Sequence, residues 1–186
     1  MDYSLLEDNA IRLRRCEPGD ALDFYRWEST PSIAMSNTLC EPISLFQAEQ
    51  LVSLGSSSLQ ENGFLYLVIE QKGDHAIRNA IGYIMLYNYD FANARSYIGI
   101  AIDERYRRKG YALRSISLMS RYANSVFRIE RLIAEITPTN LIARSLFEKA
   151  GFRLIATLPE WIRQNDTFTD LLLYALCPTP TPQSNK

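Results

Sequence analysis

Histidine, cysteine and long apolar segments are scarce in this sequence. Its 186 residues include one histidine and three cysteines, and the thiols of Cys16, Cys40 and Cys177 form no CxxC motif. Cysteines that are odd in number and widely spaced indicate reduced thiols rather than a disulfide framework or a zinc site. No apolar run reaches the ~18 residues of a membrane span, and the N-terminal segment lacks the basic and apolar regions of a signal peptide. We therefore expect a cytoplasmic protein that has no metal site and enters no membrane.

An excess of either charge is also missing. The formal net charge is -1, with 47% hydrophobic and 22% charged residues. This composition is typical of a globular protein without a general attraction to nucleic acid, so any anion site must be local. The length corresponds to one domain that can bury a core without disulfides or metal. We predict this domain at 11–176, an N-terminal leader at 1–10, and a disordered Pro/Thr tail at 177–186.

Alternating and helical apolar patterns predict the secondary structure. Strand patterns lie at 11–15, 64–70, 80–88, 96–103, 131–136, 152–158 and 170–176. One helical pattern ends at Trp27, and the others cover 45–54, follow Gly110, and cover 140–150. The residues expected to face the sheet from the last two helices are Ala112, Ile116, Met119, Ala123 and Val126, and then Ile142, Ala143, Leu146, Phe147 and Ala150.

The order of these patterns predicts the fold class. After residue 96 strands alternate with helices, which places one parallel crossover in an otherwise antiparallel arrangement. We expect an α/β fold of the α+β type. Its sheet would be mixed, mostly antiparallel and about seven strands wide, with helices on both faces.

A basic segment precedes the helix that follows Gly110. The sequence "DERYRRKGYALRSI" covers 103–116, and Arg107, Arg108 and Lys109 stand directly before the glycine. The first N–H groups of a helix are unpaired and lie at the positive end of its dipole, so this segment can bind an anion such as a phosphate group. Small residues at Gly110 and Ala112 would let phosphates approach the amides. A solvated charged loop is the alternative.

Other phosphate-binding motifs and nucleic-acid binding find less support. The patterns GxxxxGK(S/T) and GxGxxG are absent, so neither a P-loop nor a dinucleotide fold is indicated. Nucleic-acid binding through 105–109 would require a broad basic face, and the balanced charge argues against it.

Two motifs resemble signatures of the GCN5-related N-acetyltransferases. The segment "RRKGYA", which is Arg107, Arg108, Lys109, Gly110, Tyr111 and Ala112, matches the pattern Q/R-x-x-G-x-G/A. The segment "NLIARSLFEKAGF", at 140–152, is similar to the second signature, N-x-x-A-x-x-L-Y/F-E-K-x-G-F. The segments 11–29 and 158–176 resemble the subgroup that contains ribosomal-protein and spermidine acetyltransferases. The resemblance therefore covers nearly the whole predicted domain.

This resemblance implies a mode of acetyl-CoA binding. The loop 107–112 would wrap the pyrophosphate with backbone amides, and the pantetheine arm would pair with backbone near Ile100 and Ile102. Gly99 could ease a bulge in this strand or simply accommodate packing. Asn140 would contact the pantetheine or assist the reaction centre, and its alternative role is a plain N-cap.

The resemblance also implies an activity. The acetyl group would pass from acetyl-CoA to a primary amine by direct attack in a ternary complex, with strand N–H groups polarising the thioester carbonyl. Many relatives have a tyrosine acid where this chain has Phe147, a cofactor-contacting position that here cannot donate a proton. Water or another side chain must replace it, and Tyr97 and Glu28 are the candidates, unless each is an ordinary half-buried residue. The alternative function is a non-catalytic acyl-CoA-binding module or regulator.

The acceptor amine is left open by the sequence. It could be a protein N-terminus, a polyamine or another small amine. A polyamine site would use carboxylates such as Glu28, Glu41 and Glu49, whereas a peptide amino-terminus would need an open groove. Strand-edge pairing in the family implies a possible homodimer, and neither nucleic acid nor membrane is an expected partner.

Overall fold

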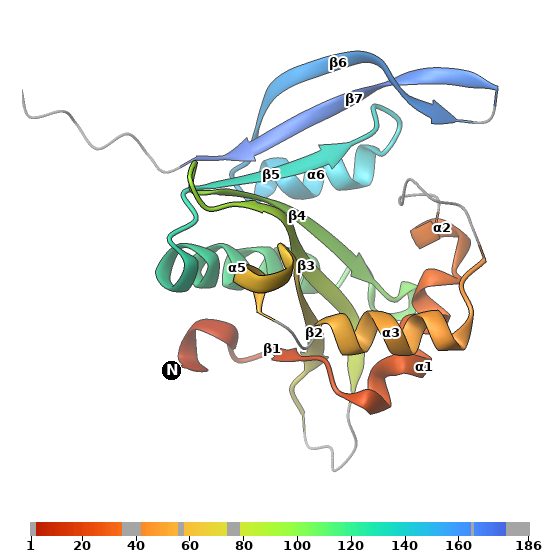
Figure 1. Ribbon diagram of the computed structural model, residues 1–186, viewed down its shortest axis with the longest axis vertical. Coiled ribbons are helices and arrows are strands. Elements are labelled where there is room, and N and C mark those ends of the chain that lie inside the picture. Colours follow the sequence, from red (N-terminus) through yellow and green to blue (C-terminus); the bar gives the residue numbers. More distant parts are fainter. Residues whose placement is uncertain (1–2, 35–41, 56–57, 74–78, 165, 178–186) are drawn as a thin grey trace, which may run out of the picture.

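A mixed sheet forms the centre of the molecule (Figure 1). The computed structural model describes residues 3–34, 42–55, 58–73, 79–164 and 166–177. Within these residues the strands are β1 (Ile11–Arg15), β2 (Leu65–Gln71), β3 (Ala80–Asp90), β4 (Arg95–Ile102), β5 (Arg131–Ile136), β6 (Arg153–Gln164) and β7 (Thr167–Leu176). They form one seven-stranded sheet in the order β1-β2-β3-β4-β5-β7-β6, and only β4 and β5 pair in parallel. The predicted fold class and the predicted crossover are confirmed.

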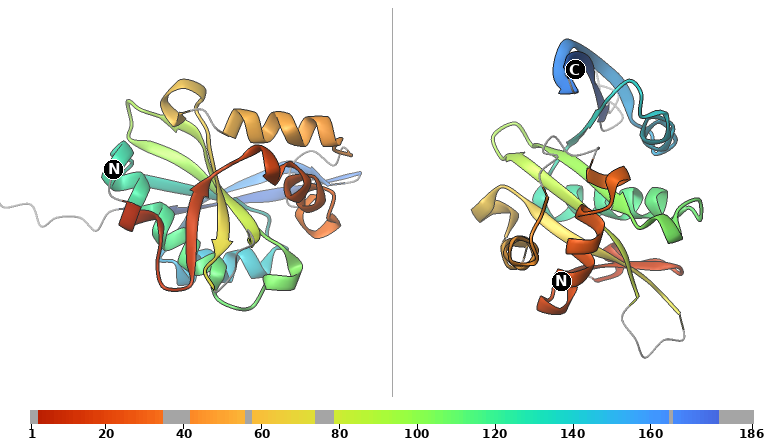
Figure 2. Two further views of the ribbon diagram at one scale, coloured as in Figure 1. Left: turned by 90° about the horizontal axis from the view of Figure 1, so that it is seen from below. Right: turned by 90° about the vertical axis from the view of Figure 1, so that its right-hand side faces the viewer.

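Helices cover both faces of this sheet (Figure 2). The α-helices are α1 (Ala21–Glu28), α2 (Pro31–Ala34), α3 (Leu45–Gly55), α4 (Leu59–Asn62), α5 (Tyr111–Phe127) and α6 (Leu141–Lys149), and the 3₁₀ turns are η1 (Tyr3–Leu6), η2 (Pro18–Asp20) and η3 (Glu104–Tyr106). Helices α1 and α3 lie on one face, against β3 and β2, while α5 and α6 lie on the other. The turn η1 belongs to the segment predicted as a leader, and Leu5 and Leu6 pack against the core on the α5 side.

Two apolar clusters correspond to the two faces. The larger cluster joins Ile116 and Met119 of α5 to Leu132 of β5 and Phe147 of α6. The smaller cluster joins helices α1 and α3 to the other side of the sheet, and it includes Phe24, Trp27, Ala48, Val68 and Tyr83. Because helices cover the apolar side chains on both faces, the sheet contributes to the core from both sides.

Two residues predicted to face the sheet do not. Val126 is 38% exposed and Ile142 is 83% exposed. At about 100° per residue, Ile142 is rotated by about 90° from the mean direction of the other expected positions of α6, and Val126 by about 50° in α5. Near either end of a helix, a spacing of three or four residues from a buried position therefore does not by itself predict that a side chain is buried.

The last hairpin is longer than the sequence predicts. Strands were expected at 152–158 and 170–176, yet β6 continues to Gln164 and β7 begins at Thr167. The register shifts between Leu158 and Ile162 and then resumes with Ile162 opposite Thr169. Pro159 lies within this irregularity, where the missing N–H interrupts no regular ladder bond. The proline therefore marks a bulge in an edge strand and not the end of the strand.

Candidate functional site

Strands β4 and β5 separate part-way along their length. They pair only from Arg95 opposite Arg131 to Tyr97 opposite Ile133. Beyond this point β4 stays paired with β3 as far as Ile102, and β5 stays paired with β7 as far as Ile136. Within the described residues, the edge of β4 that faces β5 therefore has no strand partner after the amide of Ile98.

The backbone groups on this open edge belong to alternate residues. The amide of Asp103 donates to the carbonyl of Ile81 at 2.9 Å. In an antiparallel ladder the backbone N–H and C=O groups of residues 101 and 99 therefore also point toward β3, whereas those of Ile100 and Ile102 point away from it. The carbonyl of Ile102 accepts from Nε of Arg107 at 3.0 Å. The amide of Ile98 completes the ladder with Ile133. The carbonyl of Ile98 and both backbone groups of Ile100 thus lie where an extended polar chain could pair with them, as another strand would. The pairing of a pantetheine arm near Ile100 and Ile102 stays a prediction.

Gly99 has a packing role. A Cβ at this position would lie 2.6 Å from Cε of Met85. The register between β3 and β4 runs without a shift from Gly82 opposite Ile102 to Tyr87 opposite Tyr97. The ladder with β3 therefore has no bulge at Gly99, and the close approach of Met85 supports the packing alternative.

The basic segment forms a tight loop between β4 and α5. Arg108 and Gly110 both have left-handed backbone conformations, with φ of 62° and 81°. A Cβ on Gly110 would meet nothing within 4 Å, so the glycine is needed for its conformation and not for room inside the chain. The first intrahelical bond of α5 runs from Arg114 N to Gly110 O at 3.2 Å. The preceding amides, from Tyr111 onward, therefore have no acceptor within the helix.

The cationic side chains of this loop are exposed. Arg107, Arg108 and Lys109 all face solvent. Nη1 of Arg107 also lies 3.5 Å from Oε1 of Glu104, and the ammonium of Lys109 lies 5.3 Å from the ring centroid of Tyr106. Exposed cations beside free amides at a helix N-terminus provide the electrostatic conditions for binding a phosphate group. At the start of the helix, the side chains of Tyr111 and Ala112 pack partly against the core.

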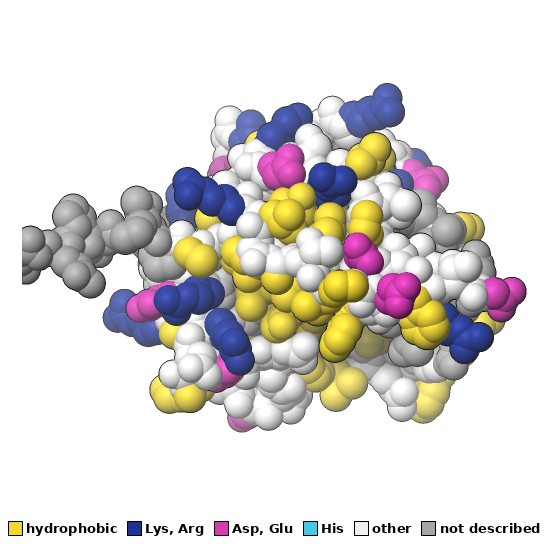
Figure 3. All heavy atoms as spheres, turned by 90° about the horizontal axis from the view of Figure 1, so that it is seen from above, with side chains coloured by type: hydrophobic (Ala, Val, Ile, Leu, Met, Phe, Trp, Pro, Cys, Tyr) yellow, Lys and Arg dark blue, Asp and Glu magenta, His cyan; other side chains and the backbone are white. Residues whose placement is uncertain are grey.

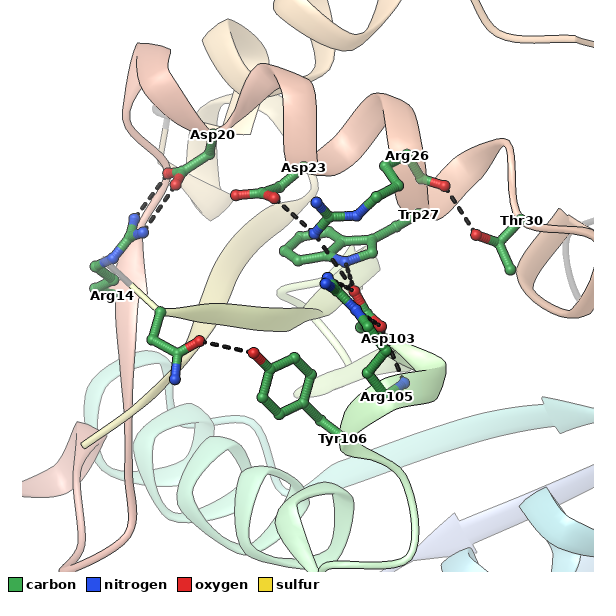
Figure 4. A network of polar contacts seen from close by, with 10 residues as sticks. Arg14, Asp20, Asp23, Arg26, Trp27, Thr30, Asp103, Arg105 and Tyr106 are labelled. Carbon is green, nitrogen blue, oxygen red and sulfur yellow. Dashed lines mark hydrogen bonds and ion pairs between the residues drawn. The ribbon is translucent and has the colours of Figure 1, made fainter. Parts of the chain in front are cut away.

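A buried carboxylate, which sequence analysis missed, holds the base of this loop (Figure 4). Asp103 is 6% exposed and accepts from Nε and Nη2 of Arg105 at 3.0 and 2.7 Å. It also caps η3 by accepting from the Arg105 amide at 3.1 Å, and Nε1 of Trp27 donates to it at 3.3 Å. The hydrogen bonds from Arg105 lower the pKa of Asp103 from 3.8 to about 2. The loop side is further fixed by Tyr106, whose hydroxyl donates to Asn79 at 3.0 Å.

Tyrosines and a carboxylate gather where β4 and β5 separate. Tyr97 lies opposite Tyr87, and their ring centroids are 5.4 Å apart. The Tyr87 hydroxyl donates to Oε2 of Glu135 at 3.1 Å. Burial, and then the charge of Glu135, raise the pKa of Tyr87, which keeps this phenol a proton donor. Because Glu135 follows Ile133 by two residues, it lies on the same face as Tyr97.

Glu135 was also missed by the sequence analysis. The only local signal is an exposed carboxylate in the alternating segment "RLIAEI" of β5, between the buried Ala134 and Ile136. Such a residue is ordinarily a solvated one. Its place beside the opening follows from which strand pairs with which.

Glu28 lies in a separate group on the same face. Its Oε1 accepts from the Tyr83 hydroxyl at 2.5 Å, and the Tyr83 ring stacks on Phe24 at 5.2 Å. Burial, followed by the charge of Glu28, raises the pKa of Tyr66 to about 12. Tyr83 and Tyr87 are four residues apart on β3, which separates the Glu28 and Tyr97 groups by about 13 Å. The two predicted catalytic candidates therefore lie at opposite ends of one aromatic face.

The remaining predicted residues have structural contacts of their own. Oδ1 of Asn140 accepts from the amide of Ala143 at 3.1 Å, so its side chain caps α6. Phe147 is 5% exposed and packs edge-on against Phe152, with centroids 5.0 Å apart. Glu49 is exposed on α3, and the third expected carboxylate, Glu41, lies outside the described residues.

The described residues contain neither a cluster of metal-ligand type nor a helix of membrane-spanning type. No three His, Cys, Asp or Glu side chains there are placed to hold a metal ion. In the same part of the chain, no helix has the length and apolar character required to cross a membrane. Cys16 and Cys177 are both free thiols.

The sequence matches a known family. The model of the acetyltransferase (GNAT) domain matches residues 10–153. An N-alpha-acetyltransferase of Saccharolobus solfataricus is 23% identical over 128 residues, which are 59% of this chain and 77% of that protein. The uncharacterized N-acetyltransferase YnaD of Bacillus subtilis is 22% identical over 156 residues, 83% of this chain and 89% of the relative.

Solved structures share the fold. A spermidine N-acetyltransferase from Vibrio cholerae, in complex with CoA and spermine, has a TM-score of 0.79 at 21% identity and covers 91% of this chain and 96% of its own. RimL, a ribosomal-protein alpha-N-acetyltransferase in complex with CoA, also has a TM-score of 0.79, at 16% identity over 91% of this chain and 95% of its own.

Proposed function

Because the chain belongs to the GNAT acetyltransferase family, we propose that it transfers the acetyl group of acetyl-CoA to a small primary amine by direct attack in a ternary complex. The enzyme class and the use of acetyl-CoA follow from the family and its named relatives. The observation that supports this mechanism is the open edge of β4 beside the loop of free amides at α5.

The residues of the opening fit acetyl-CoA. The amides and cations of 107–112 suit its pyrophosphate. Both backbone groups of Ile100 and the N–H of Ile102 suit the amides of its pantetheine arm, which needs hydrogen-bond partners in an extended conformation. An acetyl-CoA bound in this way brings its thioester to the end of the opening, next to Ile98 and Tyr97. Asn140 and Phe147 would border the arm from α6.

The reaction needs a base for the amine and a donor for the thioester oxygen. We assign the base to Glu135, since its carboxylate accepts from Tyr87, whose ring lies against that of Tyr97 near the point where β4 and β5 separate. The neutral amine attacks the carbonyl carbon and forms an N–C bond, the C–S bond breaks, and the proton passes to Glu135. The amide of Ile100, the first on this edge beyond the paired part of the strand, is the strand donor that we assign to the developing oxyanion. Tyr97 is the candidate that protonates the departing thiolate, in place of Phe147.

The acceptor side favours a cationic amine. The face between Glu28 and Glu135 is lined by tyrosine rings, which supply apolar walls, cation–π faces and polar edges. We assign Glu28 to the far end of the acceptor rather than to proton transfer, because its group lies about 13 Å from that of Tyr97 along β3. An extended polyamine suits this spacing, and the Vibrio cholerae neighbour of the same fold is a spermidine N-acetyltransferase.

Thiol release from acetyl-CoA tests the function. Wild type should show turnover with spermidine, and the panel should include amino acids, aminoglycosides and short peptides with free amino-termini. Gly110→Trp should abolish turnover by blocking the loop. Gly63→Trp is its matched control, because Gly63 also has a positive φ and open space at its Cβ but caps α4 instead. Acetyl-CoA binding without turnover above background for any amine would favour the non-catalytic binder.

We also propose a cytoplasmic location and a homodimer. The location rests on the free, widely spaced cysteines. The dimer rests on apolar side chains that gather over β6 and β7 in the view from above (Figure 3). The exposed members are Leu154 at 51%, Ile155 at 56%, Trp161 at 62% and Phe168 at 62%. An edge strand with so much exposed apolar surface is suited to pairing with a second copy.

A further inference from the structure

Asp103 connects two elements that lie far apart in the sequence. Figure 4 shows its carboxylate between the loop that precedes α5 and the side chains of α1. On the loop side, Oδ1 accepts from the amide and Nε of Arg105, and Oδ2 accepts from Nη2. On the helix side, Oδ2 accepts from Nε1 of Trp27 at 3.3 Å and lies 3.4 Å from Nη2 of Arg26.

Both sides depend on the negative charge of this one group. A carboxylate that is 6% exposed is stable only with several donors, and here every donor comes from Arg105, Arg26 or Trp27. Trp27 is 1% exposed, so its N–H would be a buried donor without an acceptor if the carboxylate moved away. The loop and the helix therefore hold each other in place through Asp103.

Each side leads directly to one substrate. Arg105 lies in η3, and the chain continues through Arg107 to the amides at the N-terminus of α5, which is the proposed pyrophosphate site. Trp27 precedes Glu28, the proposed contact for the far end of the acceptor, on the last turn of α1.

A second ion pair anchors the other end of α1. Asp20, at the N-terminus of α1, accepts from Nη1 and Nη2 of Arg14 at 2.7 and 2.8 Å. Arg14 lies on β1 and also bonds Glu70 on β2 at 2.7 Å. This anchor is buried, like that of Asp103, and its bonds through Arg14 connect α1 with β1 and β2 rather than with the loop. It therefore provides a control for effects that come from stability alone.

We infer that Asp103 is a positioning residue that couples the acetyl-CoA loop to the acceptor-side end of α1. Acetyl-CoA fixes the loop, the loop fixes Asp103, and Asp103 fixes Trp27 and with it Glu28. The coupling is reciprocal, since α1 held in place also presents Asp103 to Arg105. This inference rests on the proposed function, because it assumes that the loop binds acetyl-CoA.

CoA binding and amide hydrogen exchange test the coupling without an acceptor. In wild type, CoA should slow exchange in the loop at 104–112 and also in the last turn of α1. Arg105→Ala, whose side chain is 63% exposed and which should leave the fold intact, should raise the Kd for CoA by about three- to tenfold. Trp27→Phe, which keeps an aromatic ring but removes the N–H, should retain CoA binding and lose the protection of α1.

The control separates positioning from stability. Asp20→Asn should destabilise the protein, yet CoA should still protect α1 in this variant as in wild type. Equal protection of α1 in Trp27→Phe and wild type, or loss of protection in Asp20→Asn as well, would overturn the coupling. Unchanged CoA affinity in Arg105→Ala would overturn the loop side of it. If wild type itself fails to bind CoA, the proposed function falls, which is a different result from binding without protection.

Discussion

The charge of Asp103 should make the stability of this protein depend on acid in a defined way. Its pKa falls from 3.8 to about 2 in the folded state, a difference that corresponds to about 2 kcal/mol of free energy of unfolding. Because the folded pKa is the lower one, this contribution is fully present above pH 3.8 and is lost as the pH falls toward 2. At pH 3 about 1 kcal/mol of it is gone.

Asp103→Asn isolates this contribution. The variant keeps the size of the side chain but cannot ionise, so the other carboxylates titrate alike in both proteins and cancel in the difference. We expect urea unfolding at pH 7 and pH 5 to show the same gap in free energy between wild type and variant. The gap should narrow by about 1 kcal/mol at pH 3. A gap that does not change between pH 7 and pH 3 would refute the assignment of a buried, ionised carboxylate.

Three further substitutions test the proposed base, the packing of β3 against β4, and the proposed dimer. Glu135→Gln should lower kcat by about 100-fold or more with little change in the Kd for CoA. Its control is Glu130→Gln, an exposed substitution just before β5, which should leave kcat unchanged. A kcat for Glu135→Gln equal to that of wild type would exclude Glu135 as the base. Gly82→Ala should cost about 3 kcal/mol or more in denaturant unfolding, because its Cβ would lie 2.2 Å from the Ala101 carbonyl; a loss below 1 kcal/mol would contradict this contact. Trp161→Glu should convert a dimer to a monomer in light scattering, and a wild type that is already monomeric would rule the dimer out.

Much of the fold was predictable because its determinants are local. The boundaries of β1 and β5 were predicted without error, since each is a short alternating segment between polar turns. The start of α3 follows from a capping box in which Ser44 and Gln47 bond each other's backbone amides. The parallel crossover follows from element order alone. Each of these signals lies within a few residues of the feature that it predicts.

The site was predictable only where a motif marks it. The loop 107–112 has a contiguous sequence pattern, and the structure shows there the left-handed glycine and the free helix amides that an anion site requires. Asp103 and Glu135 have no such pattern. Their significance depends on partners 76 residues away, at Trp27, and 48 residues away, at Tyr87. Periodicity cannot reveal contacts at such separations, because they are set by the order of strands in the sheet.

The packing of strand β4 explains how an unpaired strand edge can be held in position in this sheet. Its side chains are packed on both faces, with Ile98 and Ile102 in the cluster below α5 and Ala101 in the cluster below α1 and α3. One edge is paired with β3 from Ile102 to Tyr97 and again at Arg95, and the other has no strand partner beyond Tyr97 among the described residues. Both faces of β4 and its edge toward β3 are thus fixed by packing or pairing before any ligand binds. Its open edge can therefore hold backbone donors in position at little cost in ordering, as a preorganised site requires.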